Sequence, residues 1–571
     1  QEIASLVALL KDCAKEKDLA KGYTTHASIV VEQGSQLQDD TCIANTLISL
    51  YVKCDALASA QKVFDQLHIR NVVSWNALIM GYAQHGNGQR ALDCFKCMKH
   101  EGMAPDEITF LGILKVCDTM VQQIGSKSKE IHTEIVSGRL LERNVLVGSA
   151  LIGMYAKCGK LIMAHEVFDR VWVRNVVSWN ALMVGYAHDG QGGKVLDCFE
   201  VMQVEGLSPD AVTFVCILKA CGSIKSSVKG KETHVELQRN GLLEKNVLIG
   251  NALVDMYAKC GLLTEAQDVF EHLPIRNIVS WSTLIAGYAE HGYPEKSLHW
   301  LEVMKVEGFT PNPVTFICIL KACGSIASTD EGEKIHAEVI MQGLMGTDDL
   351  IGNALLNMYA KCGAVLKAQE VFDQLHAHDV ICWTTLISGY AQHGFSEEAL
   401  NCFERMKHEG LSPNSATFIY TLKACSNIRA AGKGREIHAE IVREGLFKGD
   451  TLLGTAVMDM YAKCGALVQA RQAFDQLEIQ DLISWNTLIA GYAEEGDSEE
   501  ALNCFKQMQS ECIFPNAATF ICALKACGII GASKKAKEIH VEIMGECFLE
   551  RDISVGNALL DIYAKCGETF E

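Results

Sequence analysis

Two polar positions recur together along this chain of 571 residues. The first is always Asn, Ser or Thr, and the second, 26 or 30 residues later, is always Asn or Asp. Amide, hydroxyl and carboxylate groups donate and accept hydrogen bonds, so these pairs could recognise polar groups of a ligand. The pairs are Asn45/Asn71, Asn76/Asp106, Ser149/Asn175, Asn180/Asp210, Asn251/Asn277, Ser282/Asn312, Asn353/Asp379, Thr384/Asn414, Thr455/Asp481 and Asn486/Asn516, with Asn557 as a further first member.

The second member of each pair matches a chemical difference between nucleotide bases. U and G carry an N–H group on the Watson–Crick edge, whereas C and A carry a bare ring nitrogen there. An Asp at this position should therefore accept from U or G, and an Asn should donate to C or A. Helix capping is an alternative reason for Asn or Asp there. It does not explain a first member that varies only among Asn, Ser and Thr.

A Trp preceded by Ser or Cys shows that the pairs belong to a sequence repeat. It occurs at Trp75, Trp179, Trp281, Trp383 and Trp485, at spacings of 104, 102, 102 and 102 residues. The two extra residues lie between Cys117 and His132, where we expect a loop insertion. Each block divides into units of 35, 36 and 31 residues, and in the 35- and 31-residue units the polar pair is formed by the fifth and the last residue.

Each unit has the pattern of two helices joined by a short turn. Apolar residues at 78, 79 and 82 fit one helix face, Gly86 interrupts it, and residues 91, 95 and 98 resume the pattern. Five prolines occupy the same closing position in successive blocks, where they end a hairpin without entering a helix: Pro105, Pro209, Pro311, Pro413 and Pro515. A two-helix unit cannot bury its apolar face alone, so we predict an all-α, right-handed superhelical solenoid of about 17 hairpins.

The three kinds of unit carry distinctive motifs. Units that open Val-Val-Ser-Trp-Asn-Ala-Leu-Ile and close Met-x-x-x-Gly-x-x-Pro alternate with Thr-Phe-x-x-x-Leu-Lys-Ala-Cys units and Tyr-Ala-Lys-Cys-Gly units. This alternation resembles the P, L and S motifs of plant organellar pentatricopeptide-repeat proteins of the PLS class, over essentially the whole chain. We name the 35-, 36- and 31-residue units P-like, L-like and S-like. We expect one array over 1–571, with L-like and S-like units at 3–71 and triplets at 72–175, 176–277, 278–379, 380–481 and 482–571.

The resemblance implies single-stranded RNA binding with one base for each P-like or S-like unit. It also implies that the fifth residue sorts bases by size, with Asn favouring pyrimidines and Ser or Thr favouring purines. The L-like units carry aliphatic fifth residues, which cannot hydrogen-bond a base edge: Val7, Leu111, Val215, Ile317, Ile419 and Ile521. The expected target is 5′-CU-x-AU-x-CA-x-UA-x-GC-3′. The alternative is a protein-binding scaffold whose L-like units hold an editing cofactor protein.

The formal charge of −19 argues against a nucleic-acid partner unless positive charge is local. One Lys recurs at the thirteenth position of the S-like units, where the resemblance implies phosphate contact and a lysine at a helix end is the alternative: Lys53, Lys157, Lys259, Lys361, Lys463 and Lys565. Aliphatic second residues could sandwich the bases, or could be ordinary core between repeats: Val73, Leu146, Val177, Leu248, Val279, Leu350, Ile381, Leu452 and Ile483.

Some motifs imitate catalytic sites. A His-x-Glu sequence, the first half of a zinc-deaminase signature, begins at His132, His234, His336, His438 and His540. No Pro-Cys dipeptide follows anywhere, and five copies at the repeat period favour a structural role. Cys94 and Cys97 form an isolated Cys-x-x-Cys pair, which we interpret as incidental. We expect no catalytic residue, metal or cofactor, and the regular spacing of the cysteines favours small buried side chains in a reducing compartment.

The resemblance also implies a role in C-to-U RNA editing, because related proteins often continue into a deaminase domain. This sequence ends at 566–571, midway through an S-like unit. We therefore expect the RNA-recognition array of an editing factor, working with a deaminase in cis or in trans. No apolar run is long enough for a membrane span. We expect a monomer in a plastid or mitochondrion after loss of a transit peptide.

Overall fold

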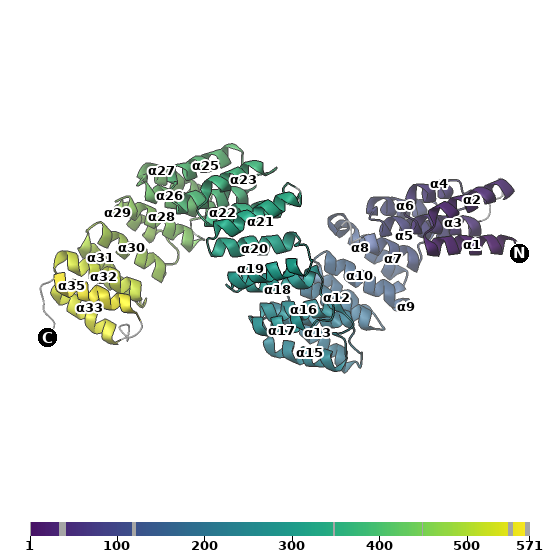
Figure 1. The fold of residues 1–571 in the computed structure, drawn as a ribbon, viewed down its shortest axis with the longest axis horizontal. Coiled ribbons are helices and arrows are strands. Elements are labelled where there is room, and N and C mark those ends of the chain that lie inside the picture. The colour runs from purple at the N-terminus through teal and green to yellow at the C-terminus, as the bar shows by residue number, and fades with distance from the viewer. Residues whose placement is uncertain are drawn as a thin grey trace. The chain divides into compact units, whose positions relative to one another are not determined.

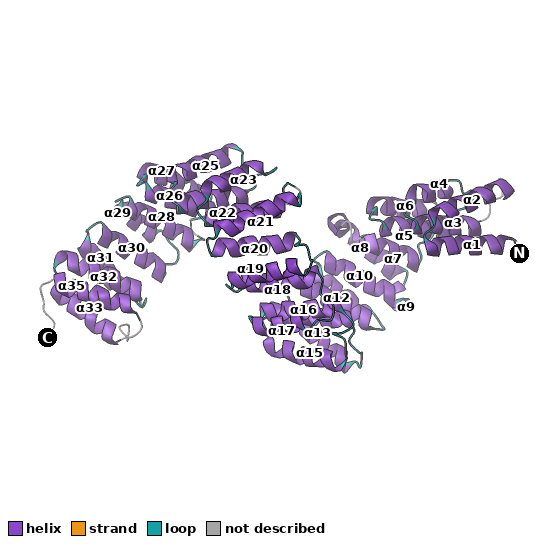
Figure 2. Ribbon diagram, in the orientation of Figure 1, coloured by secondary structure: helices purple, strands orange, loops and turns teal. Residues whose placement is uncertain are grey.

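The computed structural model describes residues 2–33, 41–116, 121–346, 349–447, 449–545 and 552–565. Within these ranges the chain forms 34 helices and no strand (Figures 1 and 2). The all-α array of about 17 hairpins expected from the sequence is thereby confirmed. The chain divides into two compact units, Gln1–Gly287 and Tyr288–Glu571.

In the first compact unit, the helices that open each hairpin are α1 (Glu2–Glu16), α3 (Thr41–Lys53), α5 (Val72–Gln84), α7 (Glu107–Lys115), α10 (Val145–Lys157), α12 (Val176–His188), α14 (Ala211–Ser223), α16 (Val247–Lys259) and α18 (Ile278–Glu290), within which the boundary falls. The second helices are α2 (Leu19–Gln33), α4 (Leu57–Asp65), α6 (Gly88–His100), α8 (Val121–Ser137), α11 (Leu161–Arg170), α13 (Gly192–Val204), α15 (Ser227–Arg239) and α17 (Leu263–Glu271), with a single turn, α9 (Leu140–Arg143), after α8.

In the second compact unit, the opening helices are α20 (Pro313–Ser325), α22 (Asp349–Lys361), α24 (Val380–Gln392), α26 (Ser415–Asn427), α28 (Thr451–Lys463), α30 (Leu482–Glu494), α32 (Ala517–Ile530) and α35 (Ile553–Lys565). The second helices are α19 (Pro294–Val306), α21 (Thr329–Met341), α23 (Val365–Gln374), α25 (Ser396–His408), α27 (Ala431–Arg443), α29 (Leu467–Asp475), α31 (Ser498–Ser510) and α33 (Ser533–Gly545).

Opening helices pack against the opening helices of neighbouring hairpins, as α12 does against α10 and α14. The contact is close because a β-carbon at Gly185 of α12 would lie 2.6 Å from the β-carbon of Ala156 in α10. Aromatic rings fill the space beside it, where Phe168 of α11 meets Trp179 of α12 edge-on at 4.4 Å between ring centres. This packing aligns the opening helices, and with them the fifth residues, in one continuous row within each compact unit.

The two-residue insertion expected as a loop lies between Cys117 and His132, in a stretch that is only partly described. Residues 117–120 lie outside the described residues, and so does the terminal segment 566–571. α8 has 17 residues, four more than the corresponding helix α15. No helix within the described ranges combines the length and hydropathy that crossing a lipid bilayer requires.

Candidate nucleic-acid interface

The last residue of each P-like and S-like unit is the N-cap of the helix that follows. Asp210 shows the arrangement, because its Oδ1 accepts from the backbone N–H of Thr213 at 2.9 Å. The Thr213 hydroxyl also donates to Asp210 Oδ1 at 2.9 Å and closes a capping box with the Asp210 backbone N–H. The same capping bond is made by Asn71, Asp106, Asn175, Asn277, Asn312, Asp379, Asn414, Asp481 and Asn516.

Capping, which the sequence offered as an alternative to base recognition, is therefore a real role of these side chains. It uses one atom only. In Asp106 and Asp210, Oδ1 accepts from the Thr backbone N–H, the Thr hydroxyl and the fifth-position Asn amide, and Oδ2 takes part in none of these three bonds. A capping Asn must turn its oxygen toward the N–H donor, so in Asn175 the amide nitrogen lies on the opposite side. The atom that differs between Asp and Asn is thus the one that capping leaves available.

The fifth residue contacts the N-cap directly when it is Asn. Asn180 donates from Nδ2 to Asp210 Oδ1 at 2.8 Å, and its Oδ1 accepts from the Thr213 hydroxyl at 2.7 Å. Asn180 is only 7% exposed, so this network holds its amide in one orientation. Corresponding amide contacts join Asn45 to Asn71 at 3.4 Å, Asn76 to Asp106 at 2.8 Å, Asn251 to Asn277 at 3.2 Å and Asn486 to Asn516 at 3.1 Å.

A fifth Ser or Thr behaves differently, because its hydroxyl donates to the carbonyl one turn earlier in its own helix. These bonds run from Ser149 to Val145, Ser282 to Ile278, Thr384 to Val380 and Thr455 to Thr451, at 2.6 to 2.9 Å. The shorter side chain is thus folded back along the helix. Two positions depart from both arrangements: Asn353 accepts from the thiol of Cys382 at 2.8 Å, and Asn557 is exposed near the end of the described array.

The third residue of the capped helix was not anticipated from the sequence. It carries a hydroxyl in nine of ten cases and is fully buried in those nine: Ser74, Thr109, Ser178, Thr213, Ser280, Thr315, Thr417, Ser484 and Thr519. The signal was present as the Ser before each Trp and the Thr before each Phe. A polar residue recurring next to a core aromatic indicates a buried hydrogen bond.

These hydroxyls also influence the charge of the N-cap. Burial alone would raise the pKa of the Asp210 carboxyl, but hydrogen bonds from the Thr213 backbone, the Asn180 amide and the Thr213 hydroxyl hold the pKa below its ordinary value. The pKa of Asp106 is lowered by the same combination, against the same effect of burial. Both carboxyl groups are therefore ionised at neutral pH and act as acceptors only.

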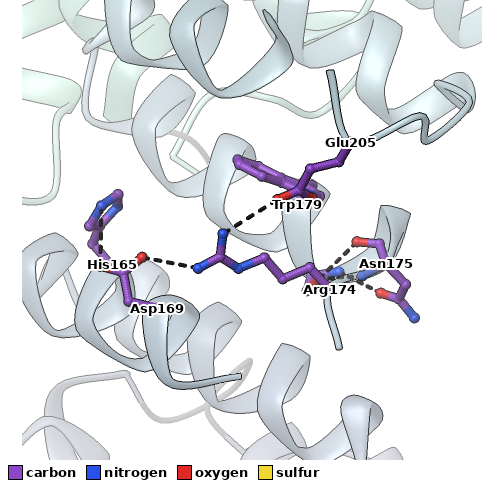
Figure 3. Close-up of polar contacts among 7 residues, drawn as sticks. His165, Asp169, Arg174, Asn175, Trp179 and Glu205 are labelled. Atoms are coloured by element: carbon purple, nitrogen blue, oxygen red, sulfur yellow. Dashed lines mark hydrogen bonds and ion pairs between the residues drawn. The ribbon is translucent and has the colours of Figure 1, made fainter. Parts of the chain in front are cut away.

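Charged side chains fix the backbone just before an S-like unit's last residue, as Figure 3 shows around Asn175. Arg174 reaches from this junction to two second helices, pairing with Asp169 of α11 at 3.3 Å and with Glu205, after α13, at 3.4 Å. Glu205 also accepts from the Trp179 indole N–H at 2.9 Å. The residue that precedes the N-cap is therefore tied to both neighbouring hairpins.

A cavity of about 650 Å³ opens beside the second P-like unit. It is lined by the pair Asn180 and Asp210 together with the second residues Val177 and Val212 and with Lys157. The structure thus brings together four of the predicted kinds of contact in one hollow. The interpretation of the second residues as core is wrong, since all nine predicted sandwich side chains are between 51% and 68% exposed.

The predicted phosphate lysines are exposed and lie in the last turn of their helices. Three of them pair with the aspartate one turn earlier, in Lys259–Asp255, Lys463–Asp459 and Lys565–Asp561, at 2.7, 2.8 and 2.6 Å. This location fits both a helix-end lysine and a phosphate contact. The phosphate role of the six lysines stays a prediction.

The L-like units lack this constellation. Val215 occupies the fifth position, and the unit ends in Asn246, which caps α16 by accepting from the Leu248 N–H at 2.9 Å. The ψ angle of Asn246 is 103°, against −177° at Asp210. The third residue of α16 is the buried Ile249, which has no hydroxyl. The L-like unit therefore keeps a cap but has neither a polar fifth residue nor the network that would hold one.

The motifs that imitate catalytic sites have structural roles. The five histidines of the His-x-Glu sequences each contact the hydroxyl of a buried Tyr through Nδ1, at 2.9 to 3.1 Å. Burial raises the pKa of Cys94 to about 12, which makes it a poor nucleophile. All described cysteines are free and most are at least partly buried, so the expectation of burial fails only for Cys42, Cys97 and Cys512. No cluster of side chains suited to a metal ion occurs in the described ranges.

Comparisons with known proteins agree with this architecture. The sequence model of the PPR repeat family matches residues 70–118, 174–223, 276–325, 378–427 and 480–528, and that of the PPR repeat matches 149–176, 251–278 and 353–380. The crystal structure of the pentatricopeptide repeat protein PPR10 in complex with an 18-nt psaJ RNA element is 17% identical, with a TM-score of 0.61 over 93% of this chain and 90% of that one. This likeness shows the fold.

Two relatives come from Arabidopsis thaliana. A chloroplastic pentatricopeptide repeat-containing protein is 30% identical over 577 residues, covering 99% of this chain and 64% of its own length. A mitochondrial one is 33% identical over 553 residues, covering 96% of this chain and 53% of its own length. The chain thus spans between half and two thirds of the length of these relatives. On the family matches and these identities, the chain belongs to the pentatricopeptide-repeat family.

Proposed function

We propose that this chain binds single-stranded RNA and reads one base with each P-like and S-like unit. The observation that carries the proposal is that only one of the two terminal atoms of each N-cap side chain makes the capping bond. Oδ1 is used by capping, so the second terminal atom, an acceptor in Asp and a donor in Asn, is available to a base edge. The complex of PPR10 with an RNA element supports RNA as the ligand.

The arrangement of the fifth residue supports sorting by base size. An Asn spans the space to the N-cap, as Asn180 does toward Asp210, and leaves room for a smaller pyrimidine. A Ser or Thr is folded back on its own helix, as Ser149 is, and leaves room for a larger purine. The exposed aliphatic second residues, such as Val177 and Val212, offer flat apolar contact for the faces of a base.

These rules give the target 5′-CU-x-AU-x-CA-x-UA-x-GC-3′. We further propose the PLS class and a role in C-to-U editing, in which the array places a deaminase near a chosen cytidine. The deaminase would be joined to this array or supplied by a partner. The relatives named as chloroplastic and mitochondrial support an organellar location.

The test is a binding titration against the target RNA and a scrambled RNA of equal composition. Each mismatched base in a nucleic-acid site typically costs about 1 to 3 kcal/mol, so the scrambled RNA should bind more than about a hundredfold more weakly. Equal affinity for the two would contradict sequence reading. It would leave a scaffold for a protein partner as the better account.

A specificity switch tests the rule at a single unit. Replacing Asn76→Thr together with Asp106→Asn should move the preferred base at that position from U to A. The matched control changes the fifth and the last residue of a unit with no assigned base, with Val215→Thr and Asn246→Asp in the L-like unit. That control should leave the preference at every assigned position unchanged.

A further inference from the structure

One cationic position is confined to the L-like units. The ninth residue of each is Lys: Lys11, Lys115, Lys219, Lys321, Lys423 and Lys525. The ninth residue of the P-like and S-like units is never basic, and it is Met80, Val184, Ala286, Ser388 and Ala490 in the P-like units. Lysine therefore appears where the polar pair is missing.

This lysine shares a helix face with the base-reading position. The fifth and ninth residues are four apart, so Lys219 lies one turn beyond Val215 on the same side of α14. The residues three and four places from Lys219 include no carboxylate: Val215, Cys216, Gly222 and Ser223. The local sequence thus leaves this ammonium group without a neighbour of opposite charge.

Many lysines of this acidic chain form ion pairs with a carboxylate, but most of the described ninth-position lysines do not. Among the described residues, Lys219, Lys321 and Lys423 are exposed and form no ion pair, and Lys525 approaches Glu494 only at 3.9 Å. The S-like lysine of the same triplet, Lys259, pairs with Asp255. An unpaired cation repeated at one position of a chain with a charge of −19 indicates an anionic ligand.

The cavity of the L-like unit is positively charged, as an anionic ligand requires. A hollow of about 490 Å³ is lined by Lys219 and Lys259, with Val215, Asn246 and Leu248, and it contains no carboxylate. The cavity of the preceding P-like unit is lined instead by one Lys and two Asp side chains. The two hollows share Val184, His188 and Val212, so a polymer crossing the first reaches the second.

The opening helix of the L-like unit also makes room for the second lysine. A β-carbon at Gly222 of α14 would lie 3.2 Å from Cδ of Lys259, so the lysine stem passes directly over this glycine. Gly324 and Lys361 repeat the arrangement at 3.4 Å. The stem is therefore supported by the L-like helix, which orients its ammonium group along that helix face.

We propose that each L-like unit is a phosphate-binding site, in which the ninth-position lysine and the S-like lysine after it hold the RNA backbone. The proposal rests on RNA binding by the P-like and S-like units. Two units in each triplet then read bases, and the third fixes the strand between them regardless of its base. Backbone contacts of this kind position a nucleic acid without reading its sequence.

The test measures how RNA affinity depends on salt. Each phosphate contact on a single strand contributes a slope of about −0.7 in log K against log salt. Replacing Lys219→Ala, Lys321→Ala and Lys423→Ala together should make the slope less steep by about 2 and weaken binding to target and scrambled RNA by equal factors. The same three positions changed to Arg should restore the slope.

The control removes the same charge from exposed lysines of second helices, with Lys62→Ala, Lys194→Ala and Lys506→Ala. It should change the slope much less. An equal change in both variants, or an unchanged slope in the first, would overturn the phosphate site and favour an acidic protein surface as its ligand. Failure of the unmodified chain to distinguish target from scrambled RNA would instead overturn base reading, so the two failures are separate.

Discussion

The second P-like unit and the L-like unit after it have the same hairpin and both end in a polar N-cap, yet the polar groups of their pockets differ. The P-like pocket holds Asn180 in a buried network with Asp210 and Thr213. The L-like pocket has Val215 at the corresponding place, and Ile249 replaces the hydroxyl. Its polar groups are lysines and the capping Asn246.

Under the proposed function, the comparison implies that a capping residue alone does not make a base-reading site. Asn246 caps its helix as Asp210 does, but no side chain of its own unit holds it from the fifth position. A reading site needs the fixed fifth residue, because an unrestrained polar group satisfies itself with water and discriminates poorly between bases. Four predictions test this difference, from the largest expected effect to the smallest.

Removing the buried hydroxyl should have the largest effect. Thr213→Val leaves Asn180 Oδ1 buried without its donor and removes both hydroxyl bonds to Asp210, which should cost about 2 kcal/mol of local stability. Hydrogen exchange of the α14 amides measures this loss. Base preference at this unit should weaken as well, whereas Thr213→Ser, which keeps the hydroxyl, should preserve both properties. Unchanged preference in Thr213→Val would show that the network is not needed for reading.

A pair of cap substitutions separates capping from reading. Asp210→Ala and Asn246→Ala each remove an N-cap and should each cost about 1 kcal/mol in the stability of the following helix. Only Asp210→Ala should also reduce discrimination at its base, by roughly tenfold. Binding to four RNAs that differ at that base measures the second effect. Equal loss of discrimination in the two variants would remove the distinction between P-like and L-like units.

Building a reading pair into an L-like unit should have a smaller effect. Val215→Asn with Ile249→Thr supplies the fifth amide and the hydroxyl beside Asn246, and should create a preference of about threefold for C at the second unassigned position. The gain is limited because the ψ angle of Asn246 differs from that of the P-like caps. Val215→Leu with Ile249→Val is the apolar control. A preference in both variants would mean that packing, not hydrogen bonding, sets it.

Acid should weaken the junction between L-like and S-like units and the junction between P-like and L-like units in different pH ranges. Burial lowers the pKa of His234, which contacts Tyr257 across the L–S junction, so its contribution is lost as pH falls below the unfolded value of 6.5. The pKa of Asp210 is also lowered, so its contribution persists down to its unfolded value of 3.8 and is lost only below that. Between pH 7 and 4.5, exchange in α15 and α16 should therefore rise before exchange in α14.

His234→Gln removes the titrating group and keeps a side chain able to bond to Tyr257. It should make the exchange rates of α15 and α16 independent of pH over this range, after correction for intrinsic rates. Exchange that still rises equally in this variant would assign the acid sensitivity to another group.

The fold could be predicted almost entirely from the sequence, because apolar spacing and the 102-residue period leave one way to bury the hairpins. The site could be predicted only in part. Sequence showed which residues form pairs, but it offered capping and recognition as alternative explanations for Asp210, and the structure shows that capping does not exclude the proposed recognition. The buried hydroxyl of Thr213 could not be predicted, because Thr lies next to the core residue Phe214 and the sequence does not show which partners its hydroxyl meets. The role proposed for the ninth-position lysines could not be predicted, because it depends on the absence of carboxylates nearby, which only the packed structure reveals.

Selection from a fully randomised RNA pool tests the central claim most directly, because it assumes no target. The selected sequences should align to 5′-CU-x-AU-x-CA-x-UA-x-GC-3′, with strong preference at the ten assigned positions and none at each x. Absence of a common motif, or preference at the x positions as strong as at their neighbours, would contradict the account of two base-reading units followed by one that does not read.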